Sequence, residues 1–138
     1  MCLFKKSKIP RIALKNIVVY KILRAYKLDN KKYYETFIRN FQVNLDYTYT
    51  GEFDRYESLY KSFKKPWIDS GYIHSFNLLD RAKKVLNSPD ICIVECIIPI
   101  GTLYWIGDDC DIASRKLRYN KIIYSELTCL NYTSIKEI

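Results

Sequence analysis

The sequence predicts a single α+β domain, built from a small mixed β-sheet and two or three helices. Its 138 residues suit one compact domain and are too few for two ordinary ones. Hydrophobic residues make up 49% of the chain and aromatic residues 15%, a composition that favours strands and half-buried surfaces over a helical bundle. β-Branched runs alternate with segments of helical spacing. We therefore expect a basic leader at residues 1–15 and one folded domain at residues 16–138.

The first strand is expected at residues 16–23, which read NIVVYKIL. This run is almost continuously apolar, so burial on both faces is predicted. Asn30 then stands where it could cap a helix over residues 31–41. The apolar side chains of that segment recur at helical spacing, at Tyr34, Phe37, Ile38 and Phe41.

In the middle of the chain the sequence predicts one exposed strand, followed by two helices with a short strand between the helices. Residues 42–50 alternate apolar and polar side chains, as an exposed strand or extended loop does. Residues 52–65 begin with acids and end with lysines, which suits a helix dipole, and Pro66 ends the pattern. The short strand GYIHSF (71–76) precedes a further helix that starts at Asn77 and stops before Pro89.

The last third of the chain is expected to be mainly β. Its strongest strand runs over residues 91–98 and ends at Pro99 and Gly101, and a second strand covers residues 102–106. The acidic segment 107–111 is predicted to be a solvated turn, because Asp108, Asp109 and Asp111 lack the ligand pattern of a calcium loop. A final strand pair or ribbon is expected within residues 116–130.

The five cysteines form an odd set with no secretory signal before them, which indicates reduced thiols. Cys92 and Cys96 fall on the same side of the strand predicted at 91–98, so we interpret them as small buried residues and expect no metal site. No segment contains the roughly 20 consecutive apolar residues that a spanning helix needs. The sequence therefore predicts a cytoplasmic protein without a membrane span.

The basic charge is concentrated at the start of the chain. Residues 1–40 hold 11 lysines and arginines against 2 acids, whereas the other 98 residues hold 12 basic and 13 acidic side chains. Such an excess can bind phosphates, which makes nucleic-acid binding through residues 1–40 one hypothesis. The alternative is a solvated face that reflects a composition rich in Lys, Ile and Asn.

Three titratable residues are candidates for catalysis: Lys21, His74 and Glu95. His74 is the only histidine of the chain and could serve as a general base, although a hydrogen-bonded strand residue is the simpler interpretation. Glu95 lies within the strand at 91–98, where a buried carboxylate would need a partner such as Lys21. The sequence contains no Gly-rich phosphate loop, Gly-x-Ser-x-Gly elbow or His-Glu-x-x-His helix.

Four segments together resemble a group of small uncharacterised proteins from Bacteroides-type gut bacteria and their phages. They are NIVVYKIL, GYIHSF, the helix containing Ala82, and CIVECIIPIGTLYWIGDDCDIASRKLRYNKII. The resemblance covers most of residues 12–125, and its most distinctive part is the IIPxGTxY turn followed by an Ala-Ser pair. It implies a shared fold and a bacterial or phage origin, and it implies no activity.

A more distant resemblance links the chain to ADP-ribosyltransferases. Tyr20-Lys21 stands in the place of an aromatic-basic pair that holds the dinucleotide, and His74-Ser75-Phe76 in the place of a Ser-containing strand before a helix. Residues 99–102 match a Pro-x-Gly turn ahead of a catalytic Glu. The resemblance implies NAD as cofactor, with Tyr20 and Ser75 as binding residues. The chain departs from the pattern at Lys21, where Arg or His is usual, and at residues 113–115, where an acid is expected.

The sequence favours a non-enzymatic binding or regulatory module over an enzyme, and a protein partner over other partners. Tyrosine suits such a surface because it offers a large contact area at little rotamer entropy. The alternatives are a divergent or inactive ADP-ribosyltransferase-like domain and a nucleic-acid binder with a basic arm. No cofactor is expected except NAD under the first alternative. The candidate surface tyrosines are Tyr33, Tyr34, Tyr47, Tyr49, Tyr56, Tyr60 and Tyr72.

Overall fold

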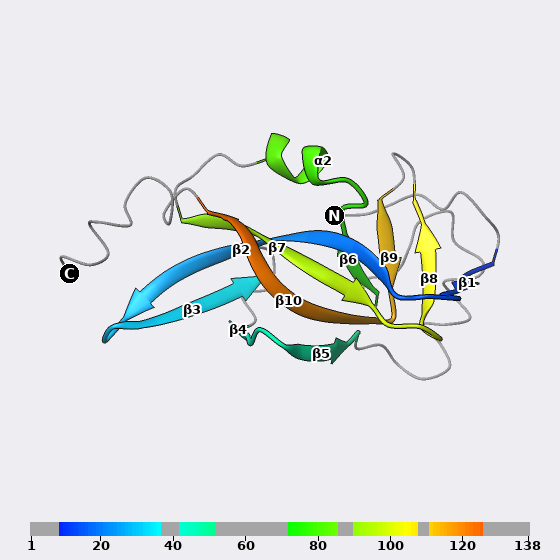
Figure 1. Cartoon of the computed structure of the whole chain (residues 1–138), viewed down its shortest axis with the longest axis horizontal. Coiled ribbons are helices and arrows are strands. Elements are labelled where there is room, and N and C mark those ends of the chain that lie inside the picture. Colours follow the sequence, from blue (N-terminus) through cyan, green and yellow to red (C-terminus); the bar gives the residue numbers. More distant parts are fainter. Residues whose placement is uncertain (1–8, 37–41, 52–71, 86–89, 108–110, 126–138) are drawn as a thin grey trace.

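The computed structural model describes residues 9–36, 42–51, 72–85, 90–107 and 111–125. These residues form two curled antiparallel sheets and a single short helix (Figure 1). The expected α+β architecture with a mixed sheet and two or three helices is therefore wrong, because the described part of the chain is mostly β. The helix predicted at 52–65 lies outside the described residues.

The larger sheet has six strands in the order β4-β3-β2-β7-β10-β5, and every neighbouring pair is antiparallel. The strands predicted at 16–23 and 91–98 are its two central members, and the first extends further along the chain than the sequence indicated. The bounds, in sheet order, are β4 Gln42–Val43, β3 Lys31–Thr36, β2 Ile17–Leu28, β7 Ile91–Ile98, β10 Lys116–Ser125 and β5 Tyr47–Thr50.

The smaller sheet has four strands in the order β1-β8-β9-β6. It comprises β1 (Arg11–Ile12), β8 (Leu103–Ile106), β9 (Ile112–Ser114) and β6 (Ile73–Ser75). The two sheets meet where Tyr20 of β2 and Phe76, which follows β6, exchange backbone hydrogen bonds of 2.8 and 2.7 Å. Strand β1 lies within the predicted leader, and Ala13 beside it is buried.

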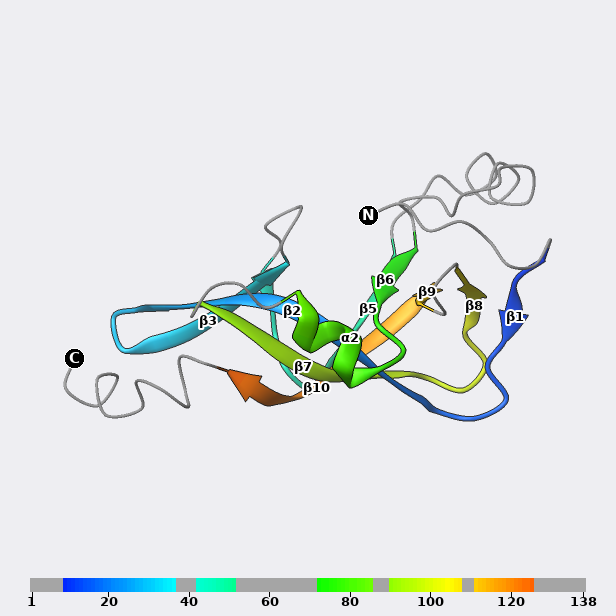
Figure 2. The ribbon, with the colours of Figure 1, turned by 90° about the horizontal axis from the view of Figure 1, so that it is seen from above.

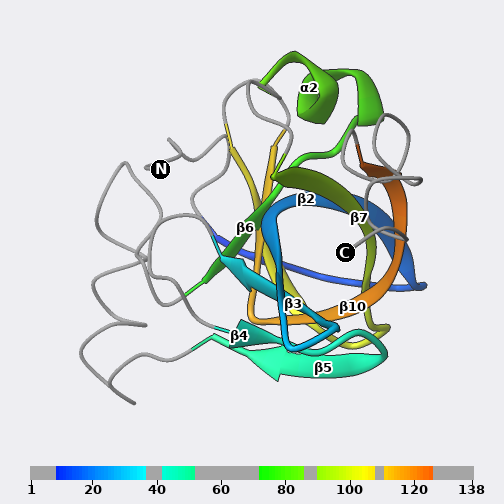
Figure 3. The same cartoon turned by 90° about the vertical axis from the view of Figure 1, so that its left-hand side faces the viewer.

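The two edge strands of the larger sheet are close in the chain, because only residues 44–46 separate β4 from β5. Asp46 adopts a left-handed φ of 61° in this connection, and its amide donates to the carbonyl of Tyr119 on β10 at 2.6 Å. The sheet must curl strongly for so short a connection to join its opposite edges, as the end-on view in Figure 3 shows. The curl encloses the main core on the concave face.

The core is lined by one face of each central strand. On β2 this face carries Val19, Leu23 and Ala25, and their register neighbours on β7 include Cys92 and Cys96. Both thiols are free and buried, as predicted for small apolar positions, and burial raises the pKa of each to about 12. The expectation that β2 is buried on both faces is wrong, because Val18 on the opposite face is 47% exposed.

A β-hairpin replaces the helix predicted at 31–41, so that prediction is wrong over β3. Leu28 pairs with Lys31, which leaves Asp29 and Asn30 as a two-residue loop with φ values of 50° and 65°. Positive φ at both positions is the signature of a type I′ turn, whose twist matches that of the flanking strands. Asn30 is therefore a turn residue rather than a helix cap. Phe37, Ile38 and Phe41 lie outside the described residues.

The turn makes a test of the hairpin straightforward. We expect Asn30→Val to lower the free energy of unfolding by about 1 kcal/mol, because a β-branched residue tolerates left-handed backbone poorly. Asn30→Gly should leave stability unchanged or slightly higher, since glycine adopts this region freely. Urea denaturation measures both, with Thr48→Val on the exposed face of β5 as control. An Asn30→Val variant as stable as the wild type would contradict the turn geometry.

Helix α2 (Leu79–Lys84) confirms the helix predicted after Asn77, in a shorter form. Its N-cap is Leu78, with no side-chain cap hydrogen bond, so Asn77 does not play the expected role. Ala82 is fully buried, and the helix packs against β2 on the convex side of the larger sheet (Figure 1). None of the helical residues that the structure describes belongs to a helix long and apolar enough to cross a membrane.

Candidate functional site

The junction between the two sheets brings two sequence-predicted site residues into contact. Lys21 lies on the core face of β2, and its Nζ donates to the backbone carbonyl of His74 on β6 at 2.8 Å. Burial lowers the pKa of Lys21 from 10.5 to about 8, and the nearby Cys96 thiol opposes that shift. The ammonium group therefore links the larger sheet to the smaller one at a cost in desolvation.

Tyr20 stands beside this contact but points to the other face of β2. Its backbone pairs with Phe76 on one side and, in register, with Glu95 of β7 on the other. The aromatic-basic pair and the Ser-containing strand of the distant resemblance are thus neighbours in space. Tyr20 and Lys21 cannot act on one ligand from the same face of the strand, because successive side chains alternate.

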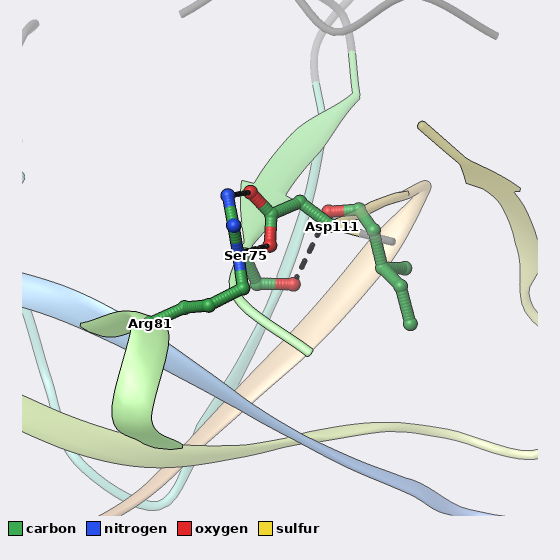
Figure 4. Close-up of polar contacts among 4 residues, drawn as sticks. Ser75, Arg81 and Asp111 are labelled. Carbon is green, nitrogen blue, oxygen red and sulfur yellow. Dashed lines mark hydrogen bonds and ion pairs between the residues drawn. The ribbon is translucent and has the colours of Figure 1, made fainter. Parts of the chain in front are cut away.

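An ion pair with a buried carboxylate lies next to Ser75 (Figure 4). Arg81 of α2 holds the carboxylate of Asp111 with two bonds, Nε to Oδ1 at 2.9 Å and Nη2 to Oδ2 at 2.8 Å. The Asp111 side chain is 3% exposed and that of Arg81 34% exposed. Next to this pair, Ser75 Oγ donates to the carbonyl of Ile112 at 3.3 Å.

The Arg81–Asp111 pair is absent from the sequence-based expectations. The sequence placed Asp111 in a solvated turn, which is wrong, since this residue is buried immediately before β9. The only sequence signal for a buried role of Arg81 was its position next to Ala82, which belongs to the apolar side of the predicted helix. Nothing in the spacing could show that the helix would face the start of β9.

Glu95 is not part of this junction. Lys21 is in register with Val94, so its side chain and that of Glu95 point to opposite faces of the larger sheet. Asn120 Nδ2 donates to Glu95 Oε2 at 3.1 Å, and Lys121 Nζ lies 3.9 Å from the same oxygen. The pairing of Glu95 with Lys21 that the sequence suggested is therefore wrong, and neighbours on β10 take that role.

His74 and Ser75 also point to opposite faces, in their case of the smaller sheet. His74 is in register with Ala113, on the face where Tyr72 and Trp105 pack edge to face at a centroid distance of 6.4 Å. Tyr72 is only 2% exposed, so its expected place on a binding surface is wrong. Lys21, His74 and Glu95 consequently do not converge as three side chains.

These contacts determine what the junction can do chemically. The Asp111 carboxylate accepts two bonds from Arg81 and is shielded from water, and the Lys21 ammonium is bonded to a carbonyl. Within the described ranges, no group of three or more His, Cys, Asp or Glu residues is arranged to hold a metal ion. The polar groups of the junction act as links between secondary-structure elements.

A second candidate surface is the projecting end of the β2–β3 hairpin, residues 26–33, which we call the arm. Arg24 is the last residue of β2 in register with β7, and beyond it β2 pairs only with β3 among the described strands. The arm extends past the ends of β7 and β10 in Figure 2. Residues 28–32 at its tip are exposed, whereas Tyr26, Lys27 and Tyr33 are partly buried.

Aromatic and basic side chains alternate on the arm. Tyr26 and Tyr33 face each other across the strands and stack with a centroid distance of 5.5 Å and an interplanar angle of 20°. Lys27 is in register with Lys32 on the other face, and Leu28 at the tip is 58% exposed. The sequence pointed to Tyr33 but not to Tyr26, because a helix at 31–41 would have kept the two rings apart.

The other tyrosines differ in their surroundings. Tyr49 of β5 packs edge to face on Tyr119 at 5.5 Å, and its hydroxyl accepts the amide of Asn44 at 2.8 Å. Tyr34 packs against the main core, whereas Tyr47 is 57% exposed. Tyr56 and Tyr60 lie outside the described residues. The arm is thus a place where partly exposed aromatic rings and exposed lysines lie together.

Comparison of the sequence and structure with protein families, curated proteins and solved structures found no match. The resemblances to the Bacteroides-type proteins and to the ADP-ribosyltransferases therefore stay predictions. The residues of the chain and their geometry are the basis on which a function can be assigned.

Proposed function

We propose that this chain is a non-enzymatic binding module that presents the arm to a macromolecular partner. The observation that carries the proposal is the arm itself, which extends a stacked tyrosine pair, an exposed leucine and three lysines beyond the sheet. Its root is fixed, because Arg24 pairs with Glu35 at 3.2 Å and with Asp90 at 3.6 Å. A surface held at its root and exposed at its tip suits recognition.

The geometry of the carboxylates also supports binding over catalysis. A transferase that cleaves a dinucleotide needs an acidic group directed at the developing positive charge. Asp111 is buried against Arg81, and Glu95 bonds to Asn120 on the face opposite Lys21. Asp111 is therefore taken up by Arg81, and Glu95 points away from the ammonium group that the resemblance would assign to the dinucleotide.

The arm is tested by comparing what three forms of the full chain retain from a cell extract. These are the wild type, Leu28→Ser/Tyr33→Ser in the arm, and Tyr47→Ser on β5 as a matched exposed-tyrosine control. We expect at least one macromolecule to bind the wild type and the control about tenfold more than the arm variant, whose fold is checked by circular dichroism. Equal retention by all three forms would refute the arm as the binding surface.

A second candidate function is an NAD-using domain of the ADP-ribosyltransferase type. It is favoured by one observation, the contact between Lys21 and His74 beside the Tyr20–Phe76 pairing, which joins the first two segments of that resemblance.

Calorimetric titration with NAD separates the two functions. For a binding module we expect no heat from the wild type at about millimolar NAD, an affinity weaker than about −4 kcal/mol. Measurable binding that Lys21→Met and Ser75→Ala both weaken, while Leu28→Ser does not, would replace the binding module by the NAD-using domain.

A further inference from the structure

We infer that the end of the molecule opposite the arm binds a membrane surface, with Leu14 and Ile100 inserted among lipids that carry anionic headgroups. These two side chains, which we call the apolar tip, lie on neighbouring loops, residues 13–16 and 99–102. The inference goes beyond the proposed function and does not depend on it, because the arm and these loops lie at opposite ends of the structure (Figure 2).

Ile100 stands at the corner of a tight turn. The amide of Thr102 donates to the carbonyl of Pro99 at 3.1 Å, and Gly101 has a φ of 86°. A bond across four residues with a positive φ at the third residue alone defines a type II turn, whose second residue here is Ile100. Turns favour Pro, Gly and small polar residues, yet this isoleucine is 64% exposed.

The other loop holds Leu14 beside this turn. The amide of Gly101 donates to the carbonyl of Ala13 at 2.8 Å, and Asn16 Oδ1 accepts the amide of Ile100 at 2.9 Å. Leu14 lies between Ala13 and Asn16 in the chain and is 87% exposed. These bonds hold the two loops side by side, so the exposed leucine and isoleucine are positioned together before any partner binds.

The apolar tip faces open space. A Cβ atom added to Gly101 would meet no heavy atom within 4 Å. Leu14 is more exposed than any other large hydrophobic residue that the structure describes. Single exposed aliphatic side chains are common on proteins, whereas adjacent ones on two bonded loops form a small apolar surface that water solvates poorly.

The charges around the apolar tip complement an anionic surface. Lys15 follows Leu14 directly and Arg11 begins β1, and both side chains are exposed. Within the described part of the chain neither of them forms an ion pair. Residues 9–18 and 97–107 contain no acid. Lysine and arginine stems can follow an inserted leucine into the interface while their charges stay among the headgroups.

The residue types favour a bilayer over a nucleic acid or a protein. Residues 9–18 and 97–102 contain no aromatic side chain on which bases could stack. Protein interfaces bury roughly 800 Å² on each partner and are enriched in aromatic residues, which two aliphatic side chains on turns do not supply. A bilayer requires no complementary pocket, since acyl chains adapt to an inserted side chain. Contact between two copies through the apolar tip would bring like charges together.

Vesicle sedimentation of the full chain tests the site. Unilamellar vesicles of phosphatidylcholine with about 30% phosphatidylserine should bind the chain roughly tenfold more tightly than vesicles of phosphatidylcholine alone. Raising the salt concentration from about 0.1 to about 0.5 M should weaken this binding several-fold, because salt screens the attraction of the headgroups for the cations.

Two pairs of serine substitutions separate insertion of the apolar tip from general adsorption. Leu14→Ser/Ile100→Ser should lower the partition coefficient on the anionic vesicles by roughly tenfold or more, because neither position then buries an aliphatic side chain in the lipid. The control, Leu78→Ser/Val85→Ser, removes two exposed aliphatic side chains at the ends of α2 and should change the coefficient less than about threefold. Circular dichroism checks that both variants are folded.

A pair of charge variants tests the electrostatic part of the site. Lys15→Gln should weaken binding to the anionic vesicles by about fivefold and leave the weak binding to neutral vesicles unchanged. Lys31→Gln, which makes the same change in net charge at an exposed position on the arm, should have less than about half of that effect.

Each other outcome overturns the inference. Equal losses in the two serine pairs would show that no site exists at the apolar tip, and binding that salt abolishes but Leu14→Ser/Ile100→Ser leaves unchanged would show adsorption without insertion. If neither kind of vesicle binds the chain, the bilayer is not the partner. A dimer in sedimentation velocity that the same variant dissociates would then assign the apolar tip to a contact between copies.

The arm is tested separately in the same assay. Leu28→Ser/Tyr33→Ser should bind the anionic vesicles as the wild type does, because the arm lies at the other end of the structure (Figure 2). Failure of the membrane site therefore leaves the proposed function of the arm standing, and loss of vesicle binding in this arm variant would overturn the assignment to the apolar tip.

Discussion

Replacing Arg81 by methionine is expected to lower the free energy of unfolding by about 3 kcal/mol, because it leaves the buried carboxylate of Asp111 without its main partner. Replacing Asp111 by leucine should cost less, about 1 to 2 kcal/mol, since Arg81 is 34% exposed and can reach water. The double variant should recover part of the loss, because no charge then stays buried. Urea denaturation at pH 7 measures all three.

The matched control is the exposed pair of Arg118 and Asp46, whose charged atoms are 3.7 Å apart and whose side chains are 47% and 72% exposed. Arg118→Met should change stability by less than about 0.5 kcal/mol, as exposed ion pairs contribute little. A loss below about 1 kcal/mol for Arg81→Met would show that water reaches Asp111, and the ion pair would then not join α2 to β9.

Replacing Lys21 by methionine is expected to have the opposite effect and to raise stability at pH 7 by about 2 kcal/mol. Burial lowers the pKa of this ammonium from 10.5 to about 8, so the folded state disfavours the charged form that both states hold at pH 7. Loss of the bond to the His74 carbonyl offsets the gain by about 1 kcal/mol. Methionine keeps nearly the same length and stays apolar.

The stability gain of Lys21→Met should change with pH in a direction that can be measured. Between pH 8 and 10.5 the unfolded chain binds more protons at Lys21 than the folded chain does, so this residue makes stability rise with pH. The advantage of Lys21→Met should therefore be constant below pH 8 and shrink as pH rises to 10.5. The thiols of Cys92 and Cys96, whose pKa burial raises to about 12, act in the opposite direction above pH 9. Because Lys21 lowers the pKa of Cys96, the two proteins are compared between pH 7 and pH 9.

Lys116→Met, at an exposed position on β10, is the control and should leave stability at pH 7 nearly unchanged. A loss of several kcal/mol on replacing Lys21 at pH 7 would contradict the expectation. It would mean that the bond between the ammonium group and His74 stabilises the junction by more than burial of the charge costs.

The sequence predicted the fold best where one signal was strong and local. The run of β-branched and small apolar residues at 91–98, interrupted only by Glu95, predicted β7 correctly, because a strand covered on most of both faces needs that composition. The prediction failed at residues 31–36, where aromatic residues suit a helix and a strand alike and the deciding feature was the left-handed loop at Asp29 and Asn30. Strand β9 was missed because its three residues are too few to show a period.

The candidate site was predictable only in its parts. Lys21 and His74 were named separately, and their contact depends on two strands that are 53 residues apart in the chain. Alternation along β2 and β7 could have shown that Lys21 and Glu95 point to opposite faces, but only once the register between these strands was known. Arg81 and Asp111 carry no pattern at all, since their pairing is set by how α2 lies on the sheets.

The strand order of the larger sheet has a consequence for how fast the chain can fold. Strand β5 pairs with β10, as Tyr49 does with Leu117, and β2 pairs with β7, so the main pairings join distant parts of the chain. A topology dominated by such distant pairings folds slowly, in milliseconds to seconds. During synthesis β5 leaves the ribosome well before its partner β10, so its edge stays without this partner until the last strand arrives.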